Sequence, residues 1–436
     1  IPVLGKYIII AISAVMILSV NSNFLIWSAF AACMIIFVFP LFLLGTVTPS
    51  LVKYTVDDLE DSGKTVGMLN ASNTIGSIIG TFLPTFVTIP SVGTSITFLI
   101  FAGILLLLSI IYFTSSKKKS IKAVVGVLVF VVACFFGKSD SFAFWEEDLT
   151  YEGESIYNYL QVSEDDREVY LSTNVLFGVQ SVYVKGDELT GMYYDYAMAA
   201  PMMACVNEKD SLDVLILGMG TGTFATQCTK YFDGMNIEGV EIDEDITNLA
   251  REYFHLSEDI PVTTYDGRAY LNAIDKKYDV IMVDAYQDIT IPFQMSSVEF
   301  FTLVKNHLKD DGIMVVNMNM KSSAEGNINE YLADTIGNVF EYIYTADVRG
   351  MTNRELFAGN SPDMLSRLKL NNQKEKDMVL KNMINTIDGR LEKYVKGDYL
   401  MTDDKAPVEL LGMKAIDEII KEPKKYGINR IYFDEK

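Results

Sequence analysis

The first 137 residues contain five long runs of apolar side chains with few polar positions between them. The runs extend over Val3–Val20, Phe24–Leu44, Val66–Ile89, Ile96–Phe113 and Ala123–Phe136. A helix needs roughly 20 apolar residues to cross the hydrocarbon core of a bilayer. The pattern therefore predicts an all-α transmembrane domain of about five spans over residues 1–138. Because the chain starts inside an apolar run and without Met, we expect a truncation at its N-terminus.

Beyond Lys138 the spacing of apolar residues changes to the alternation that is typical of β-strands. Short strands are predicted at Ser155–Val162, Glu168–Leu171 and Gln180–Val184. They indicate a small β-rich lead-in over residues 139–205. From Leu212 onward, strand-like and helix-like segments alternate, which predicts a parallel sheet with helices on both faces. We therefore expect an α/β, Rossmann-like domain over residues 206–436.

The first predicted strand of this domain runs directly into a glycine-rich turn. The strand is Asp213–Leu217, the turn is Gly218-Met219-Gly220-Thr221-Gly222, and a helical pattern through Tyr231 follows. Glycines allow a tight turn and a close approach of the backbone to a ligand. Many strand-to-helix turns contain glycines for packing alone, so the loop by itself leaves both interpretations open.

Each of the next three predicted strands ends in a carboxylate. The strands are Asn236–Glu241, Val262–Tyr265 and Val280–Val283, and the acids are Glu241, Asp266 and Asp284. Glu241 lies 19 residues past Gly222, a spacing that suits an acid that binds ribose hydroxyls. A single acid at a strand end is equally well explained as the cap of the next helix. Three such acids beside a glycine loop favour a binding site at the carboxyl ends of the strands. A fifth strand, Ile313–Asn317, is predicted after a turn at Asp310-Asp311-Gly312.

Charge divides the chain in two. Up to Gly137 there are seven Lys, no Arg and four acidic residues, a net charge of +3. The whole chain carries −21, so the remaining residues carry −24. Such an acidic domain repels nucleic acid phosphates, and we expect no nucleic acid partner. Two His and four Cys without a C-x-x-C pair predict neither a metal site nor a disulfide framework.

The Lys residues of the apolar part also bear on topology. They adjoin alternate loops, and the turns at Asn21–Asn23 and Pro90–Thr94 carry none. The positive-inside rule places all Lys-bearing loops in the cytoplasm. The acidic domain would then lie outside the cell if the fifth run spans the membrane, and inside if that run lies in the interface.

In these motifs the chain resembles the class I S-adenosylmethionine-dependent transferase fold and, within it, the spermidine synthase family. The resemblance covers about 250 residues, from Tyr157-Asn158 to Asp403-Asp404, and is strongest over Val214–Gly222, Gly239–Asp243, Asp266-Gly267 and Val280–Asp284. The apolar part is similar to the N-terminal domain of bacterial proteins that fuse a membrane region to a spermidine-synthase-like domain. That second similarity lies in Gly45–Ser50 and Gly67–Gly80.

The resemblance implies a nucleoside site and a catalytic acid. The glycines of the loop, Gly218, Gly220 and Gly222, would face the amino-acid-derived arm of the donor. Glu241 would bind the ribose, and Asp266 with Gly267 would approach the adenine. Asp284 matches the acid that takes a proton from the attacking amine.

On the substrate side the resemblance implies contacts from Gln180 and Tyr193, with Tyr194 as the alternative tyrosine, and Asp288 is a further candidate. Asp403 and Asp404 would either add acids to the acceptor site or, with Thr402, cap a helix. Two departures concern the same region. Thr221 replaces the loop Asp that aminopropyltransferases typically have, and Asp284-Ala285-Tyr286-Gln287-Asp288 lacks their Asp-Ser-Ser-Asp-Pro pattern.

Three functions follow from this reading. The first is transfer of an aminopropyl group from decarboxylated S-adenosylmethionine to a diamine such as putrescine. The second is methyl transfer from S-adenosylmethionine, which Thr221 keeps open. The third is a non-catalytic membrane sensor or transport component, against which the retained Asp284 argues. We expect a small-molecule amine and membrane lipid as partners, leave a homodimer open, and expect a multi-pass protein of the cell membrane. We favour a cytoplasmic acidic domain because the co-substrate is a cytoplasmic metabolite.

Overall fold

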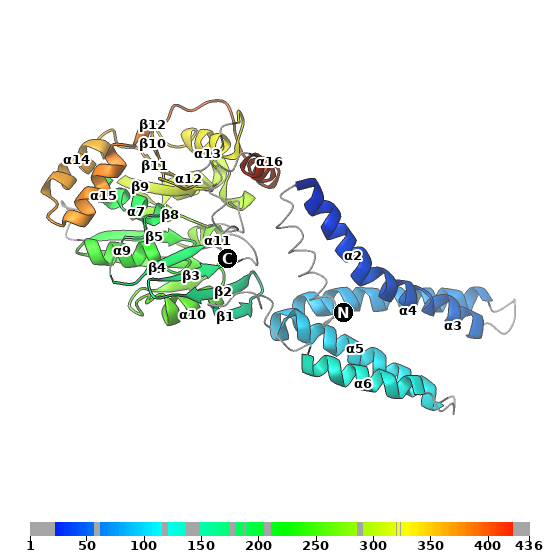
Figure 1. Cartoon of the computed structure of the whole chain (residues 1–436). Helices are drawn as coiled ribbons and strands as arrows, with labels where there is room; N and C mark the ends of the chain where they lie inside the picture. Colours follow the sequence, from blue (N-terminus) through cyan, green and yellow to red (C-terminus); the bar gives the residue numbers. More distant parts are fainter. Residues whose placement is uncertain are drawn as a thin grey trace. The chain divides into compact units, whose positions relative to one another are not determined.

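The computed structural model describes residues 22–55, 62–115, 121–136, 149–173, 179–186, 189–204, 211–285, 291–319, 321–322 and 324–421. The chain divides into two compact units. Unit 1 comprises Ile1–Trp145 with Glu152–Tyr157, and unit 2 comprises Glu146–Tyr151 with Asn158–Lys436. Figure 1 labels most of the helices and strands of both units.

The described residues of unit 1 from Ser22 to Phe136 are mainly helical. They form α2 (Ser22–Gly45), α3 (Val47–Thr55), α4 (Ser62–Leu83), the π-helical turn η1 (Pro84–Thr88), α5 (Ile89–Ser115) and α6 (Ile121–Phe136). Two stretches, Phe30–Thr55 and Ser62–Ser115, are long and apolar enough to cross a membrane, and α6 is a shorter apolar helix. Within the second stretch the chain leaves helical geometry at Gly93, where φ is 75° and ψ is 172°, inside the predicted turn at Pro90–Thr94. The predicted run Val3–Val20 lies outside the described residues.

The lead-in forms a four-stranded sheet in the order β1-β2-β3-β4. The strands are β1 (Leu149–Glu154), β2 (Tyr159–Glu164), β3 (Glu168–Ser172) and β4 (Ser181–Val184). The predicted strand at Ser155–Val162 was placed too early, because its first residues turn: the Ser155 hydroxyl accepts a hydrogen bond from the Tyr157 amide at 3.1 Å. Strand β1 was missed. The buried face of this sheet, which includes Leu160 and Leu171, packs on Ile246 and Leu249 of α10 (Glu244–Tyr253).

The main sheet of unit 2 has eight strands in the order β12-β10-β11-β9-β8-β5-β6-β7. They are β5 (Leu212–Leu217), β6 (Met235–Glu241), β7 (Val262–Thr264), β8 (Tyr278–Val283), β9 (Leu308–Met318), β10 (Tyr342–Asp347), β11 (Arg354–Gly359) and β12 (Glu392–Lys393). Strands β5 to β9 are parallel, and β11 runs antiparallel between β9 and β10. The chain winds outward in both directions from β5, which is the Rossmann-like arrangement that the sequence predicted.

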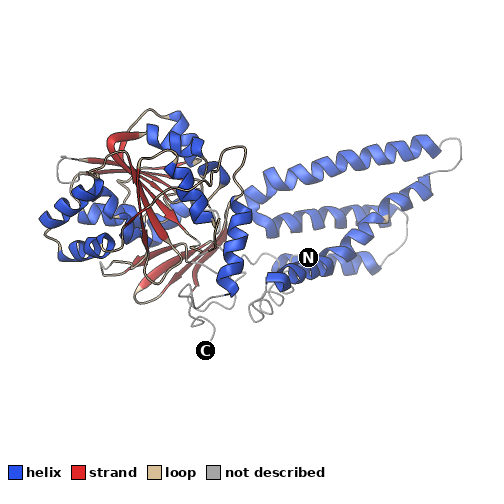
Figure 2. Ribbon diagram, turned by 90° about the horizontal axis from the view of Figure 1, so that it is seen from above, coloured by secondary structure: helices blue, strands red, loops and turns tan. Residues whose placement is uncertain are grey.

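Helices cover both faces of this sheet (Figure 2). Alternate residues of β5 point to opposite faces: Val214 and Ile216 join one core, and Leu215 and Leu217 join the other. The first core includes residues of α7 (Tyr193–Ala197), α8 (Ala199–Met203), α9 (Thr223–Tyr231), α14 (Met364–Lys374) and α15 (Met378–Asp388). The second includes residues of α11 (Gly267–Ala273), α12 (Val298–Asn306), α13 (Ile328–Gly337) and α16 (Val408–Lys421).

The predicted turn at Asp310-Asp311-Gly312 is wrong, because β9 continues through it. Tyr278 of β8 pairs with Leu308, whereas Val280 pairs with Ile313, so the register shifts between them. The extra residues are taken up as a bulge, in which two strands stay paired although one has more residues than its partner. Arg367 of α14 donates to the Asp311 carboxylate at 2.9 Å and so anchors the bulge from outside.

Candidate active site

The glycine loop connects β5 to α9 and lies directly against the end of β8. Gly218, Gly220 and Gly222 have φ values of 86°, 52° and 77°, a left-handed region that favours glycine. A Cβ atom at Gly218 would lie 2.5 Å from the backbone oxygen of Asp284. Glycine at this position therefore allows the loop and the end of β8 to approach each other.

Glu241, the last residue of β6, is hydrogen-bonded to this loop. Its carboxylate accepts from the Gly220 amide at 2.8 Å and from the Asp243 amide at 3.2 Å. Burial raises the pKa of Glu241 above its ordinary value, although the two amide donors act in the opposite direction. The structure thus brings the predicted ribose acid and the glycine loop together.

Asp266 and Gly267 follow β7 and begin α11. The Asp266 carboxylate accepts from the Ala269 amide at 2.8 Å and caps the helix. A Cβ atom at Gly267 would lie 3.6 Å from the Cβ of Leu217, the residue that precedes the glycine loop. Capping therefore accounts for one oxygen of Asp266, and the pair lies near the end of β5.

Asp284 is held at both of its carboxylate oxygens. The Tyr193 hydroxyl donates to Oδ2 at 2.7 Å, and the Asn317 amide donates to Oδ1 at 2.9 Å. Asn353 in turn donates to the side-chain oxygen of Asn317 at 2.9 Å, which fixes the orientation of that amide. The carboxylate at the end of β8 is thus held by residues of α7 and β9, and the residue before β11 holds Asn317 in turn.

The environment of Asp284 moves its titration toward neutral pH. Burial raises the pKa of Asp284 to about 7, although the hydrogen bonds from Asn317 and Tyr193 lower it, and the charge of Glu241 adds to the rise. Burial and the neighbouring Asp284 raise the pKa of Tyr193 well above its ordinary value, so the phenol keeps its proton. A carboxylate that titrates near 7 exchanges protons with substrates efficiently at neutral pH.

Of the two candidate tyrosines, Tyr193 is the one that binds Asp284. The Tyr194 hydroxyl instead donates to the backbone oxygen of Gln180 at 2.6 Å. The ring centroids of Tyr193 and Tyr194 are 3.9 Å apart, so Tyr194 links the backbone of Gln180 to the tyrosine that binds Asp284. The candidate Asp288 lies outside the described residues.

A buried acid, Asp195, supports the position of α7. Asp195 is fully buried and accepts from the Gly191 amide at 2.6 Å, from the Thr190 hydroxyl at 2.9 Å and from the Gln227 amide at 2.5 Å. These bonds tie α7 to the preceding loop and to α9. The position of Tyr193 is therefore set by a polar network beneath it as well as by apolar packing.

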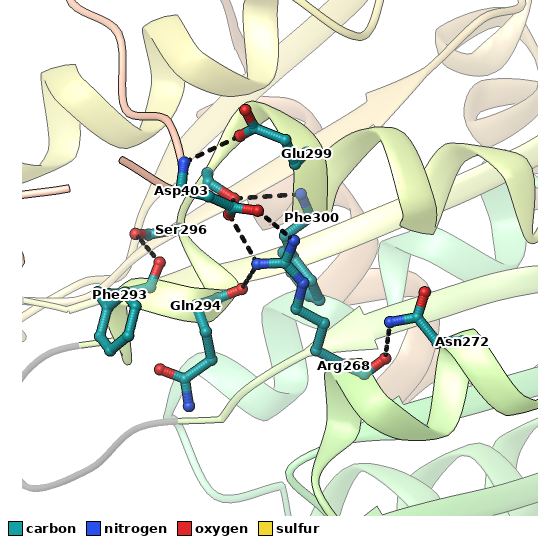
Figure 3. A network of polar contacts seen from close by, with 9 residues as sticks. Arg268, Asn272, Phe293, Gln294, Ser296, Glu299, Phe300 and Asp403 are labelled. Atoms are coloured by element: carbon teal, nitrogen blue, oxygen red, sulfur yellow. Dashed lines mark hydrogen bonds and ion pairs between the residues drawn. The ribbon is translucent and has the colours of Figure 1, made fainter. Parts of the chain in front are cut away.

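Asp403 forms an ion pair with Arg268 (Figure 3). Its carboxylate receives both terminal nitrogens of Arg268, at 2.7 and 2.6 Å, and the Ser297 hydroxyl at 2.5 Å. Its own amide donates to Glu299 at 3.1 Å. Helix α16 begins only at Val408, so the expectation that Thr402 and Asp403 cap a helix is wrong. The Asp403 carboxylate is bound by Arg268 instead, whose hydrogen bonds lower the pKa of Asp403.

The sequence interpretation also missed Asn317, Asn353 and Glu355. Asn317 is a polar residue at the carboxyl end of a predicted strand, which is the same signal that identified the acids. Glu355 is a charged residue next to Leu356-Phe357-Ala358, an apolar run. Among the residues that the structure describes, no cluster of three or more His, Cys, Asp or Glu side chains could hold a metal ion.

Comparison with known proteins places this site in a family. The model of the spermine/spermidine synthase domain matches residues 192–351. A probable polyamine aminopropyl transferase of Bifidobacterium longum (strain NCC 2705) is 53% identical over 331 residues, which cover 72% of this chain and 73% of that protein. A polyamine aminopropyltransferase of Oceanobacillus iheyensis is 27% identical over 296 residues, 63% of this chain and 56% of that protein.

Among solved structures, a probable spermidine synthase from Corynebacterium glutamicum ATCC 13032 matches with a TM-score of 0.44 at 20% identity and covers 57% of this chain and 97% of that one. The sequence relatives carry the assignment. The residues matched by the domain model include Tyr193, the glycine loop, Glu241, Asp284 and Asn317. With 53% identity across more than two thirds of both chains, this chain belongs to the spermine/spermidine synthase family of polyamine aminopropyltransferases.

Proposed function

We propose that the chain transfers an aminopropyl group from decarboxylated S-adenosylmethionine to a diamine such as putrescine, with Asp284 as the general base. The observation that carries this proposal is the site of Asp284. Its carboxylate has a pKa of about 7 and is oriented by Tyr193 and Asn317. The relatives named polyamine aminopropyltransferases support the same reaction.

The chemistry requires little more than a base and good positioning. A protonated alkylamine is not a nucleophile, so Asp284 accepts a proton from the amine as its nitrogen attacks the carbon bonded to the sulfonium. The new C–N bond forms, and the electron pair of the broken C–S bond leaves with sulfur as methylthioadenosine. The Tyr193 hydroxyl and the Asn317 amide hold the carboxylate in one orientation during the transfer.

In this proposal the donor lies along the carboxyl ends of the first three parallel strands. Gly218, Gly220 and Gly222 face its aminopropyl arm. Glu241 binds the ribose, and Asp266 with Gly267 lies beside the adenine. Gln180, Tyr193 and Asp288 contact the amine acceptor. The hydrogen bond between Glu241 and the Gly220 amide supports a common site for the first two groups.

We further propose that residues 1–138 anchor the enzyme as a multi-pass membrane domain, that residues 139–205 form the lead-in, and that residues 206–436 form a catalytic domain on the cytoplasmic side. Large apolar side chains along the helices of unit 1 support the first part. Phe82, Leu107 and Phe135 are 58%, 58% and 80% exposed, which suits contact with lipid.

A product assay tests the reaction. The full chain in detergent is incubated with decarboxylated S-adenosylmethionine and putrescine, and we expect methylthioadenosine and spermidine in equal amounts. Thr221 in the glycine loop keeps methyl transfer as a second candidate. Formation of S-adenosylhomocysteine and a methylated amine from S-adenosylmethionine would replace the proposal with that candidate. Absence of product from both donors would refute both transferase activities.

A further inference from the structure

Glu355 lies next to the group of residues that holds Asp284. Strand β11 pairs antiparallel with β9, and in this register Glu355 is directly opposite Asn317. Directly opposed residues in an antiparallel pair share a face, with Cβ atoms about 4.5–5.5 Å apart. Asn317 also donates to Asp284 at 2.9 Å, so Glu355 and Asp284 have Asn317 as a common neighbour.

The carboxyl group of Glu355 has no partner among the described residues. Its side chain is 0% exposed, and both oxygens are buried without a hydrogen bond to any described residue. Burial, and after it the charge of Asp284, raises the pKa of Glu355 well above its ordinary value. A buried carboxylate without a partner is costly to the fold. A cation that arrives with the substrate would remove that cost.

The described residues of the site provide no cation for these two acids. The salt bridges of the described chain involve neither Asp284 nor Glu355. The partners of Asp284 are a phenol and an amide, both neutral. The glycine loop carries Thr221 and no acid of its own. Glu355 is therefore a buried carboxyl group beside Asp284 that a positive charge brought by a substrate would ionise.

We propose that Glu355 binds a primary alkylammonium group of a substrate in the site of Asp284. This inference rests on the proposed function, since that reaction brings two such groups: the amine of the donor's aminopropyl arm and the distal amine of the diamine acceptor. An ammonium donates up to three hydrogen bonds. It would satisfy the two orphan oxygens and favour the ionised form of the carboxyl.

Binding measurements on the Glu355→Gln variant test the proposal, because glutamine keeps the size of the side chain and removes its charge. Three ligands are titrated into the full chain by calorimetry: methylthioadenosine, which has no ammonium, decarboxylated S-adenosylmethionine, and putrescine after saturation with methylthioadenosine. We expect unchanged affinity for methylthioadenosine and at least roughly tenfold weaker binding of one of the two amines, as for loss of a charged hydrogen bond. If only the binding of decarboxylated S-adenosylmethionine is weakened, Glu355 binds the donor's ammonium. If only the binding of putrescine is weakened, it binds the acceptor's ammonium.

The control is Glu392→Gln, which removes the charge of an exposed glutamate in β12 and should alter none of the three affinities. Unchanged affinity for both amines in a folded Glu355→Gln protein would overturn the proposal, as would an equal loss for all three ligands. If Glu355→Gln does not fold, Glu355→Met suits the apolar surroundings and carries the same test. Failure of the wild-type protein to bind any of the ligands would instead refute the proposed function itself.

Discussion

Asp284 and Asp403 are both multiply hydrogen-bonded carboxylates of unit 2, but they differ in the charge of their partners. Asp403 binds the guanidinium of Arg268 through both oxygens, and its pKa is lowered. Asp284 binds a phenol and an amide, and burial raises its pKa to about 7. A carboxylate that has a cation from its own chain is stabilised in the charged form. One with neutral partners remains able to take a proton or to meet a cationic substrate.

The charge of the partners thus distinguishes Asp403 from Asp284, but it does not by itself mark a reactive acid, because the structural Asp195 also accepts only from neutral donors. Glu241, Asp266 and Asp284 all stand at strand ends, and yet Asp266 accepts from a backbone amide at the start of α11, whereas Asp284 accepts from two side chains of distant segments. Glu355 belongs with Asp284, because it too lacks a cation among the described residues.

The largest effect is expected from Asp284→Asn, which removes the base while it keeps the shape of the side chain. Turnover should fall by about 10²–10⁴-fold, the usual contribution of a general base. Binding of methylthioadenosine, measured by calorimetry, should be unchanged. The matched change Asp403→Asn should leave turnover within about threefold of wild type. Equal losses of turnover in the two variants would break the distinction between the acids.

The substitution Gly218→Ala tests how closely the glycine loop packs against the end of β8. Its Cβ would lie 2.5 Å from the Asp284 backbone oxygen, whereas one at Gly350, which has a similar φ of 76°, meets nothing within 4 Å. Both changes carry the left-handed backbone cost of about 1–2 kcal/mol. Gly218→Ala should lose roughly a further 1–3 kcal/mol of unfolding free energy through overpacking, measured by denaturant unfolding. Similar losses in the two variants would show that the loop does not press on the end of β8.

A smaller effect is expected from Tyr193→Phe, which removes one of the two hydrogen bonds to Asp284. Loss of a hydrogen bond to a charged group costs about 1.5–3 kcal/mol, so kcat/KM should fall roughly 10- to 100-fold. Since this bond lowers the pKa of Asp284, its loss should move the acid limb of the pH profile to higher pH. The control Tyr194→Phe removes the hydroxyl that binds the Gln180 backbone and should leave that limb in place. A downward shift in Tyr193→Phe would contradict the assigned partner.

The smallest effect is expected from Asp403→Asn on stability. The carboxylate is partly exposed, with 42% of its side chain accessible, so the loss at pH 7 should not exceed about 1 kcal/mol. Its folded pKa is lowered from 3.8, so its stabilisation is present above that value and is lost as the pH falls through the folded pKa. Thermal unfolding should therefore distinguish the variant from wild type at pH 7 and not at acid pH. A difference that persists at acid pH would show that the ion pair is not its source.

Much of the fold was predictable because parallel strands buried on both faces read as continuous apolar runs. The predicted strands at Asp213–Leu217, Asn236–Glu241 and Val280–Val283 differ from β5, β6 and β8 by no more than two residues at either end. The bulge in β9 was not predictable from its Asp-Asp-Gly sequence, which is also typical of turns. Strand β1 was missed because Leu149–Glu154, LTYEGE, has little apolar alternation.

The candidate site was predictable where a motif has a fixed spacing and not where tertiary pairing creates it. The structure brings together the glycine loop, Glu241, Tyr193 and Asp284, which the resemblance identified. Asn353 and Glu355 reach the site only through the antiparallel pairing of β11 with β9, which no local pattern encodes. The partner of Asp403 was equally hidden, because Arg268 lies 135 residues away in the chain.

The most direct test of the central claim is the pH dependence of kcat/KM for methylthioadenosine release from decarboxylated S-adenosylmethionine and putrescine. Asp284 must be ionised to accept a proton, so the rate should rise with pH through a midpoint near its pKa of about 7. The residual rate of Asp284→Asn should lack that limb. A wild-type midpoint near the ordinary value of 3.8, or the same limb in Asp284→Asn, would contradict the assignment of Asp284 as the base.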